Sequence, residues 1–338
     1  MREFLEELKV TQKGNPIRIR FVCLTHPHDD HYAGLGRLLE AFLGGVDAVW
    51  SVPKVGDRYT KALMTYAEAT RAGREPLPDD VEFNGLERVL GALNRAQRNG
   101  AKVKHVSQGK DLLRFSTSSG DLVVMGCGPA DEDVENALPA LLQGVENLIE
   151  NGSHDARFDP NATSGALLLR WGKAGILLGG DLLCASGFYK GWNEVFGDIH
   201  PPVQVIKTSH HASEEAHHEE LWQRLGAHLA IVTPFKSAEG SMPPRPERIS
   251  RLAQKAVVAI TATPAWRTAK GNPSPIFTSL GKSKSSGVTS ARNGVLKLSP
   301  KPSGADIHNA IAVSLNASGK IVRLVFGGKA NVYEPPVP

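Results

Sequence analysis

The chain has 338 residues, of which 41% are hydrophobic and 22% are charged, and its formal net charge at pH 7 is +4. This composition is ordinary for a globular protein with a large core, and so mild a positive charge is not by itself a sign of nucleic-acid binding. No apolar run approaches the ~20 residues that span a bilayer, and the acidic N-terminal stretch lacks the pattern of a secretory signal, so we expect a cytoplasmic protein with no membrane partner. The three cysteines are widely spaced and predict reduced core thiols rather than a disulfide framework.

Predicted strands and helices alternate along the chain, which is typical of a layered α/β fold. In the first half we expect strand 17–24, helix 31–43, strand 47–52, helices 60–72 and 85–97, strands 101–106, 111–115 and 121–126, and helix 134–150. In the second half we expect strands 165–170, 174–179 and 203–207, helix 217–226, strand 228–233, helix 247–255 and strand 256–262.

The C-terminal part of the chain has a different composition. Residues 267–306 are rich in Ser, Gly, Lys and Pro, which predicts a long flexible or loosely packed loop. The segments 308–316 and 320–326 are apolar enough to rejoin the core, and we expect them to form a closing hairpin over 308–326. Residues 1–338 are therefore expected to form a single domain.

Three histidines and two aspartates lie in the run Thr25-His26-Pro27-His28-Asp29-Asp30-His31. The run follows an apolar, β-branched strand and precedes a helix whose leucines share one face, so the histidines lie at a strand-to-helix junction. A solvated polar loop is the simpler explanation for two neighbouring histidines. Histidine and aspartate are, however, ligands of zinc and related divalent ions, and their alternation at the end of a rigid strand favours a metal site.

The spacing His-x-His-x-Asp-His, carried by His26, His28, Asp30 and His31, resembles the metallo-β-lactamase superfamily. The resemblance implies a four-layer αββα sandwich of the α/β class, in which His26 and His28 bind one metal ion and Asp30 and His31 bind a second. Asp29 is the variable position of the pattern and is expected to have no role. Only 16 residues precede the first predicted strand, so either the usual first strands of this fold are missing or re-cut, or another element completes that edge of the sheet. An open sheet edge invites pairing with another chain, which makes a protein partner at the N-terminal edge an expectation.

The resemblance also predicts an aspartate and a histidine further along the chain, each directly after an apolar strand. Asp181 ends such a strand in the run Gly179-Gly180-Asp181, and its two carboxylate oxygens can bridge two cations. Strand 203–207 leads to a histidine pair, of which His210 is the first choice for the second metal ion and His211 is the alternative. As simpler explanations, the aspartate would cap a helix and the histidines would be exposed polar residues. Their joint occurrence in the expected order favours metal ligands.

The second half resembles one branch of the superfamily, the metallo-β-lactamase-like domain of bacterial DNA-uptake (competence) channel proteins and its free-standing relatives. The overall resemblance spans roughly residues 17–265. The motifs that narrow it to this branch are Asn161-Ala-Thr-Ser164, Gly179-Gly180-Asp181 and Lys207-x-x-His210-His211-Ala212-Ser213.

Asn161 stands where much of the superfamily has a third histidine of the first metal site. A neutral amide is a poor zinc ligand, so the first ion would be held by His26, His28 and the bridging Asp181, and manganese or magnesium becomes more favoured there. His154 is a nearby reserve ligand.

The resemblance implies two divalent ions ~3.5–4 Å apart, which lower the pKa of a shared water and activate it for hydrolysis. Zinc is the first expectation for these ions and manganese the second. Lys207 and Ser213 flank the histidine pair and are candidates for contact with an anionic substrate, although a solvated lysine and a turn serine explain them equally well. We therefore expect a phosphodiester hydrolase, a nuclease or nucleotide phosphodiesterase, whose partner is a nucleic acid or a nucleotide. The expected catalytic residues are Asp30, Asp181 and Lys207, and the expected pocket residues are Asn161, Ser164 and Ser213.

Two alternatives remain open at this stage. One is hydrolysis of a carboxylic ester, lactam or thioester at the same metal centre. The other is a non-catalytic member of the fold that acts as a binding or assembly subunit, which Asn161 and the missing first strands favour and the otherwise complete ligand set opposes. Scattered basic residues that could follow a nucleic-acid backbone form no clear stripe: Lys104, His105, Lys110, Arg114, Lys270 and residues 282–285.

Overall fold

The structure is a computed structural model, and it describes the chain in several stretches with gaps between them. The described residues are 19–32, 34–41, 45–51, 86–151, 159–235, 243–262, 277–278, 285–292, 295–300, 311–326 and 331–333. The chain divides into two compact units, each of which is assembled from separate segments of the sequence. Unit 1 comprises Met1–Gln108, Gly128–Gly165 and Ser186–Gly191, and unit 2 comprises Gly109–Cys127, Ala166–Ala185 and Trp192–Pro338. The single domain over residues 1–338 stays a prediction, and the predicted helix 60–72 lies outside the described residues.

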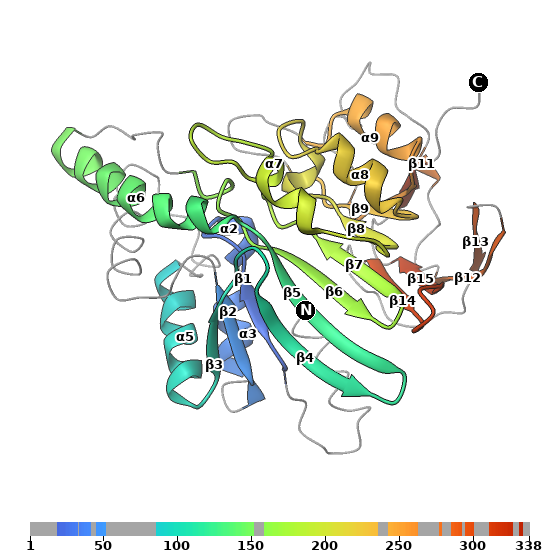
Figure 1. The fold of residues 1–338 in the computed structure, drawn as a ribbon, viewed down its shortest axis with the longest axis horizontal. Helices are drawn as coiled ribbons and strands as arrows, with labels where there is room; N and C mark the ends of the chain where they lie inside the picture. Colours follow the sequence, from blue (N-terminus) through green and yellow to red (C-terminus); the bar gives the residue numbers. More distant parts are fainter. Residues whose placement is uncertain are drawn as a thin grey trace. The chain divides into compact units, whose positions relative to one another are not determined.

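Unit 1 contains a parallel sheet whose described strands have the order β1 (Val22–Leu24), β2 (Ala48–Ser51) and β3 (Lys102–His105) (Figure 1). Its described helices are α2 (Asp29–Tyr32), α3 (Leu35–Ala41), α5 (Leu86–Arg98) and α6 (Asp131–Asn151). One apolar cluster joins the sheet to α3 and α5 through side chains that include Val22, Leu39, Val49 and Leu93. The strand, the turn with the histidines and the first helix are therefore anchored on a common core.

The predicted helix 31–43 is two helices rather than one. α2 ends at Tyr32 and α3 begins at Leu35. Between them Gly34 has a φ of +81°, which lies in the left-handed region that interrupts a right-handed helix and that glycine adopts without steric cost. The other predicted helices and strands that fall on described residues before residue 263 are confirmed, with shifts at their ends.

Asp133 connects α6 to the distant segment Ser186–Gly191. Its side chain is fully buried, Oδ1 accepts a hydrogen bond from the backbone N–H of Lys190 at 2.9 Å, and Oδ2 accepts one from Gly191 at 2.9 Å. We expect Asp133→Asn to lower the free energy of unfolding by about 1–3 kcal/mol, because the amide nitrogen cannot accept a hydrogen bond and leaves one buried N–H without a partner. Urea denaturation would measure this loss.

Glu132→Gln is the matched control for Asp133→Asn. Glu132 pairs with the Lys190 ammonium at 2.6 Å, but both side chains are largely exposed to solvent. The loss from Glu132→Gln should therefore stay within about 1 kcal/mol. Equal losses in the two variants would contradict the role assigned to Asp133.

Unit 2 contains a nine-stranded sheet with the order β11-β16-β10-β9-β8-β7-β6-β5-β4. The strands are β4 (Asp111–Thr117), β5 (Gly120–Gly128), β6 (Ala166–Trp171), β7 (Ala174–Leu178), β8 (Val205–Lys207), β9 (Leu229–Val232), β10 (Val257–Ile260), β11 (Phe277–Thr278) and β16 (Asn331–Tyr333). The four neighbours β7, β8, β9 and β10 are parallel. Because the carboxyl ends of parallel strands meet at one edge of a sheet, the loops after β7, β8 and β9 are neighbours.

The described helices of unit 2 are short. They are α7 (Trp192–Val195), η3 (Phe196–Asp198), η4 (His210–Ala212), α8 (Glu219–Leu225) and α9 (Pro246–Ala253). In the described part of the chain, no helix is both long enough and apolar enough to cross a membrane.

The C-terminal region forms a second, four-stranded sheet of unit 2. Its order is β13-β12-β15-β14, with β12 at Ser285–Arg292, β13 at Val295–Pro300, β14 at Ile311–Leu315 and β15 at Ile321–Phe326. The predicted closing hairpin is confirmed by the antiparallel pair of β14 and β15. The core cluster that includes Val205, Leu229 and Ala259 also contains Ile321, so the hairpin does rejoin the core.

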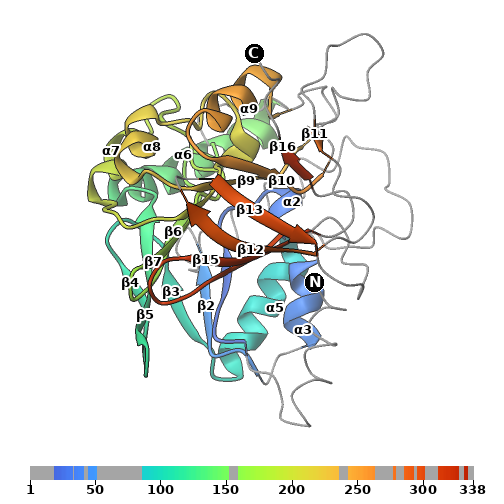
Figure 2. The same cartoon turned by 90° about the vertical axis from the view of Figure 1, so that its right-hand side faces the viewer.

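The prediction of a loosely packed loop over 267–306 is wrong for the described residues in that range. β12 and β13 form an antiparallel pair, seen side by side in Figure 2. The prediction was based on the Ser- and Gly-rich composition and did not use two sequence features that are typical of a hairpin. These are the alternating apolar residues of Val295-Leu-Lys-Leu and the dipeptide Asn293-Gly294, which is common in turns.

The three cysteines are free thiols, as expected. Burial raises the pKa of Cys23 and of Cys127 to about 12 and that of Cys184 to about 11. Because the thiolate is the reactive form, none of these residues is an activated nucleophile at neutral pH.

Candidate metal centre

The histidine turn, residues 25–31, lies at the carboxyl end of β1 in unit 1. His26 is fully buried, and its Nε2 lies 3.2 Å from Nδ1 of His28. Two nitrogens bound to one tetrahedral zinc ion at about 2.1 Å each are separated by about 3.4 Å. The two imidazoles therefore have the ligand type and the spacing that a single ion requires.

Two hydroxyl groups contact the Nδ1 atoms of His26 and His31. Nδ1 of His26 lies 3.0 Å from Ser164 Oγ and 3.2 Å from Thr25 Oγ1, and the same Thr25 oxygen lies 3.2 Å from Nδ1 of His31. A hydroxyl oxygen that accepts the Nδ1 proton leaves the lone pair of Nε2 for a metal ion. Ser164, expected to line the pocket, thus contacts the Nδ1 side of a candidate ligand. On the other side of the turn, Asp30 Oδ2 lies 3.4 Å from His31 Nε2.

Asn161 lies in the turn that leads to Ser164. Its backbone N–H donates to Asp159 Oδ1 at 2.9 Å, and its carbonyl accepts from the Ser164 N–H at 3.0 Å. Its side-chain Oδ1 is buried and has no hydrogen-bond partner among the described residues. An unsatisfied buried oxygen costs about 1–3 kcal/mol, so this atom fits a cation or an ordered water. His154, the reserve ligand, lies outside the described residues.

Asp181 follows β7 in unit 2, and its position depends on the close approach of the ends of β7 and β8. Ser209 Oγ donates to the Gly179 carbonyl at 3.1 Å and accepts from Trp192 Nε1 at 3.0 Å. A Cβ on Gly179 would collide with the Ser209 side chain, so only glycine allows this contact. The Asp181 carboxylate is consequently buried, with 1% of its surface exposed.

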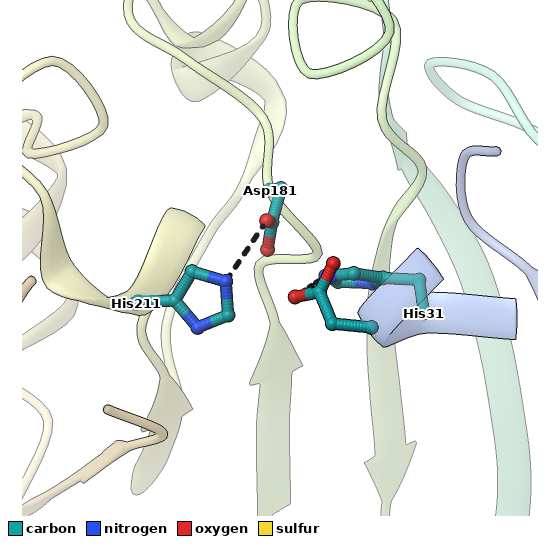
Figure 3. A group of neighbouring side chains, drawn as sticks. His31, Asp181 and His211 are labelled. Carbon is teal, nitrogen blue, oxygen red and sulfur yellow. Dashed lines mark ion pairs between the residues drawn. The ribbon is translucent and has the colours of Figure 1, made fainter. Parts of the chain in front are cut away.

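Each oxygen of Asp181 faces a different side chain of unit 2. Oδ2 lies 3.4 Å from Nε2 of His211, the pair that Figure 3 joins with a dashed line. Oδ1 lies 3.7 Å from the Lys207 ammonium, which also donates to the Gly180 carbonyl at 3.1 Å. Asp181 thus presents one oxygen to an imidazole and the other to an ammonium group.

The structure favours His211, the second choice from the sequence, over His210. His211 is buried and its Nε2 faces Asp181 Oδ2, whereas His210 is only partly buried and has its Nδ1 3.0 Å from Ser213 Oγ. The cause is the backbone of η4, in which His210, His211 and Ala212 have φ values of 39°, 56° and 62°. Three successive residues in the left-handed region are costly, and such strain is concentrated at functional sites.

The residues expected to read phosphate have other partners in the structure. Lys207 lies against Asp181, and Ser213 lies against His210. Arg114 pairs with Asp111 and Asp121, which neutralise its charge. Lys104, His105 and Lys110 also have interactions within the protein, and Lys270 and residues 282–284 lie outside the described residues.

Three residues that the sequence did not single out contact candidate ligands. Thr25 contacts His26 and His31, Thr233 accepts a hydrogen bond from His211, and Phe235 stacks on the His211 ring. Thr25 adjoins the motif and could have been found from its hydroxyl group. The shorter contact of Thr233 is through its backbone carbonyl, at 2.7 Å, and its hydroxyl lies 3.4 Å from the same His211 nitrogen. A backbone carbonyl leaves no sign in the sequence.

Candidate metal ligands thus occur in both units. They include Asp30 and His31 in unit 1 and Asp181 and His211 in unit 2. The chemistry of these donors, imidazole and carboxylate, fits zinc, manganese or iron.

Comparison with known proteins gives one match that spans most of the chain, a family model described as the metallo-beta-lactamase superfamily, over residues 3–227. No curated protein matches the chain. Among solved structures, a mutant of CmlA beta-hydroxylase is 18% identical, with 65% of this chain and 37% of that chain covered and a TM-score of 0.33. CmlA, a diiron beta-hydroxylase from Streptomyces venezuelae, is 20% identical, with 58% and 26% covered and a TM-score of 0.29. The chain thus spans well under half the length of either protein, and at these scores neither bears on its chemistry. Because the family model spans more than half of the 338 residues and the motif His-x-His-x-Asp-His lies within it, the chain belongs to the metallo-β-lactamase superfamily.

Proposed function

We propose that this protein is a metal-dependent hydrolase that cleaves phosphodiesters, as a nuclease or nucleotide phosphodiesterase. The observation that supports it most directly is Asp181, a buried carboxylate whose two oxygens face His211 Nε2 and the Lys207 ammonium. A carboxylate so deeply buried needs cationic partners, and one lysine together with an imidazole and divalent ions would supply them.

In this proposal the ligand set is taken from the superfamily pattern, in which the histidine turn and the downstream residues Asp181 and His211 serve one dinuclear centre. His26 and His28 would hold the first ion, Asp30, His31 and His211 would hold the second, and Asp181 would be shared between them. The buried Oδ1 of Asn161, which has no hydrogen-bond partner among the described residues, would add an oxygen ligand for the first ion and so favour manganese beside zinc. Two divalent ions held there would supply a water of lowered pKa and a polarised phosphoryl group.

The side chains have defined tasks around these ions. Thr25 and Ser164 hold the imidazoles of His26 and His31 in one orientation. Lys207, whose side chain is 21% exposed, balances the charge of Asp181 and presents its ammonium to a substrate phosphate. The earlier resemblance to DNA-uptake channel domains is consistent with this substrate class and stays a prediction, as does a protein partner at the edge formed by β1.

Lys207→Ala tests the choice of substrate class. If Lys207 contacts a phosphate oxygen, the KM for a phosphodiester should rise about tenfold, since a charge-assisted hydrogen bond of about 1.4 kcal/mol is lost. Hydrolysis of a carboxylic ester should be nearly unchanged. Steady-state kinetics with bis(p-nitrophenyl) phosphate and p-nitrophenyl acetate, each with added manganese or zinc, would measure both effects.

Lys190→Ala is the matched control, because Lys190 is a half-exposed lysine that pairs with Glu132 in unit 1. It should alter neither substrate's kinetics. An equal fall for both substrates in Lys207→Ala would mean that Lys207 acts through Asp181 alone. Wild-type activity on the ester and none on the phosphodiester would instead support the ester, lactam or thioester hydrolase, and activity on neither would support the non-catalytic binding subunit.

A further inference from the structure

We infer that the loop after β9 holds the His211 imidazole in the orientation that metal binding needs, with Thr233 and Phe235 as positioning residues. The inference rests on the proposed metal centre, in which His211 is a ligand. All the contacts that carry it lie within unit 2.

The first contact decides which ring nitrogen carries the proton. Nδ1 of His211 lies 2.7 Å from the carbonyl oxygen of Thr233, the first residue after β9. A carbonyl oxygen can only accept, so Nδ1 is the protonated nitrogen and donates this bond. In the neutral ring Nε2 is then an unprotonated acceptor, and it faces Oδ2 of Asp181 at 3.4 Å. Two acceptors that face each other across this distance are satisfied by a cation bound to both.

The second contact restricts the plane of the ring. The Phe235 and His211 rings are stacked, with 4.8 Å between centroids and an interplanar angle of 18°. A single hydrogen bond at Nδ1 would still let the imidazole tilt about that bond, and the aromatic face removes this freedom. The Phe235 backbone N–H donates to the Pro243 carbonyl at 2.9 Å, which anchors the loop.

The two contacts together act on a residue whose own backbone is strained. His211 has a φ of 56° and is 7% exposed. Such a backbone conformation persists when the surrounding structure over-determines it. Partners of this kind behind a metal-binding histidine orient the ring and typically change metal affinity about 10–100-fold when they are lost.

Phe235→Leu tests the inference in the full-length chain. We expect the zinc affinity of the purified variant to fall about tenfold or more in competition with a chromophoric chelator, and Phe235→Tyr to restore it. Ring ¹⁵N NMR of the metal-free protein at pH 8.5 should show the Nδ1–H tautomer of His211 in the wild type and a mixture of tautomers in Phe235→Leu. A role in general packing alone would not move the tautomer.

Phe196→Leu is the matched control. Phe196 stacks on His218 with 4.1 Å between centroids and 30° between planes, in the same unit, but Nδ1 of His218 accepts a hydrogen bond from the Leu221 N–H at the start of α8. This variant should leave zinc affinity and the His211 tautomer unchanged.

The outcomes separate this inference from the proposed function. Unchanged zinc affinity in Phe235→Leu, or an Nε2–H tautomer of His211 in the wild type, would overturn the positioning role even if the protein is a hydrolase. A wild type that binds no zinc or manganese would overturn the metal centre, and with it the inference that depends on it. Should Phe235→Leu not fold, Phe235→Tyr and the wild-type tautomer decide the question.

Discussion

Asp181→Asn is expected to reduce the rate of phosphodiester hydrolysis by more than about 10³-fold, because Asp181 is proposed to be a metal ligand itself. Loss of a residue that only contacts a metal ligand typically costs about 10–100-fold. The substitution preserves the shape of the side chain but removes its charge and one of the two oxygens that face His211 and Lys207. The site lies in a loop after β7 rather than in an apolar cluster, so the fold should be retained. Measurements of kcat/KM with added manganese, metal content after dialysis and the circular dichroism spectrum would test the three parts of this expectation.

Asp133→Asn is the matched control for Asp181→Asn, because it makes the same chemical change at a buried aspartate that is not a candidate metal ligand. Asp133 is as deeply buried as Asp181, but it accepts hydrogen bonds from two backbone N–H groups. This variant should be less stable than the wild type and should keep its metal content and its kcat/KM under conditions where it is folded. If Asp181→Asn retains wild-type hydrolysis, Asp181 does not bridge metal ions.

His28→Ala is expected to remove one of two bound ions, because His26 and His28 are the imidazoles proposed to hold the first ion. In the manganese-loaded wild type, two ions bridged by one carboxylate at ~3.5–4 Å should give a spin-coupled electron paramagnetic resonance spectrum. His28→Ala should bind about one ion per chain and give an uncoupled spectrum, and Asp181→Asn should lose affinity for both ions. Elemental analysis of the same samples would supply the stoichiometry.

His210→Ala is the matched control in this series. His210 precedes His211 but lies against Ser213, so its loss should leave two coupled ions bound. Loss of an ion in His210→Ala would restore the first choice made from the sequence. Two uncoupled ions in the wild type would mean that the histidine turn and Asp181 bind metal separately, which would contradict the single dinuclear centre.

The sequence by itself determined the features that depend on short stretches of chain. The apolar runs predicted β1, β7 and β8, and the spacing His-x-His-x-Asp-His placed candidate ligands directly after the first of them. The match of the family model over residues 3–227 confirms the family. The sequence alone could predict it because the motif depends on the local spacing of residues between a strand and a helix. The prediction of a loop over residues 267–306 relied on amino-acid composition rather than on the alternation of apolar residues, and it was wrong at β12 and β13, which form an antiparallel pair.

Only the tertiary structure decided how the candidate ligands are oriented. His210 and His211 are equivalent in a strand-to-turn pattern, and the left-handed backbone of η4 places the second of them at Asp181. The proton on its Nδ1 is held by the carbonyl of Thr233, 22 residues further along the chain. Lys207 could be recognised as a lysine at a strand end, but its pairing with Asp181 requires β7 and β8 to be parallel neighbours. Residue types and their local spacing are written in the sequence, whereas the direction of a side chain depends on backbone torsions and on partners brought close by the sheet.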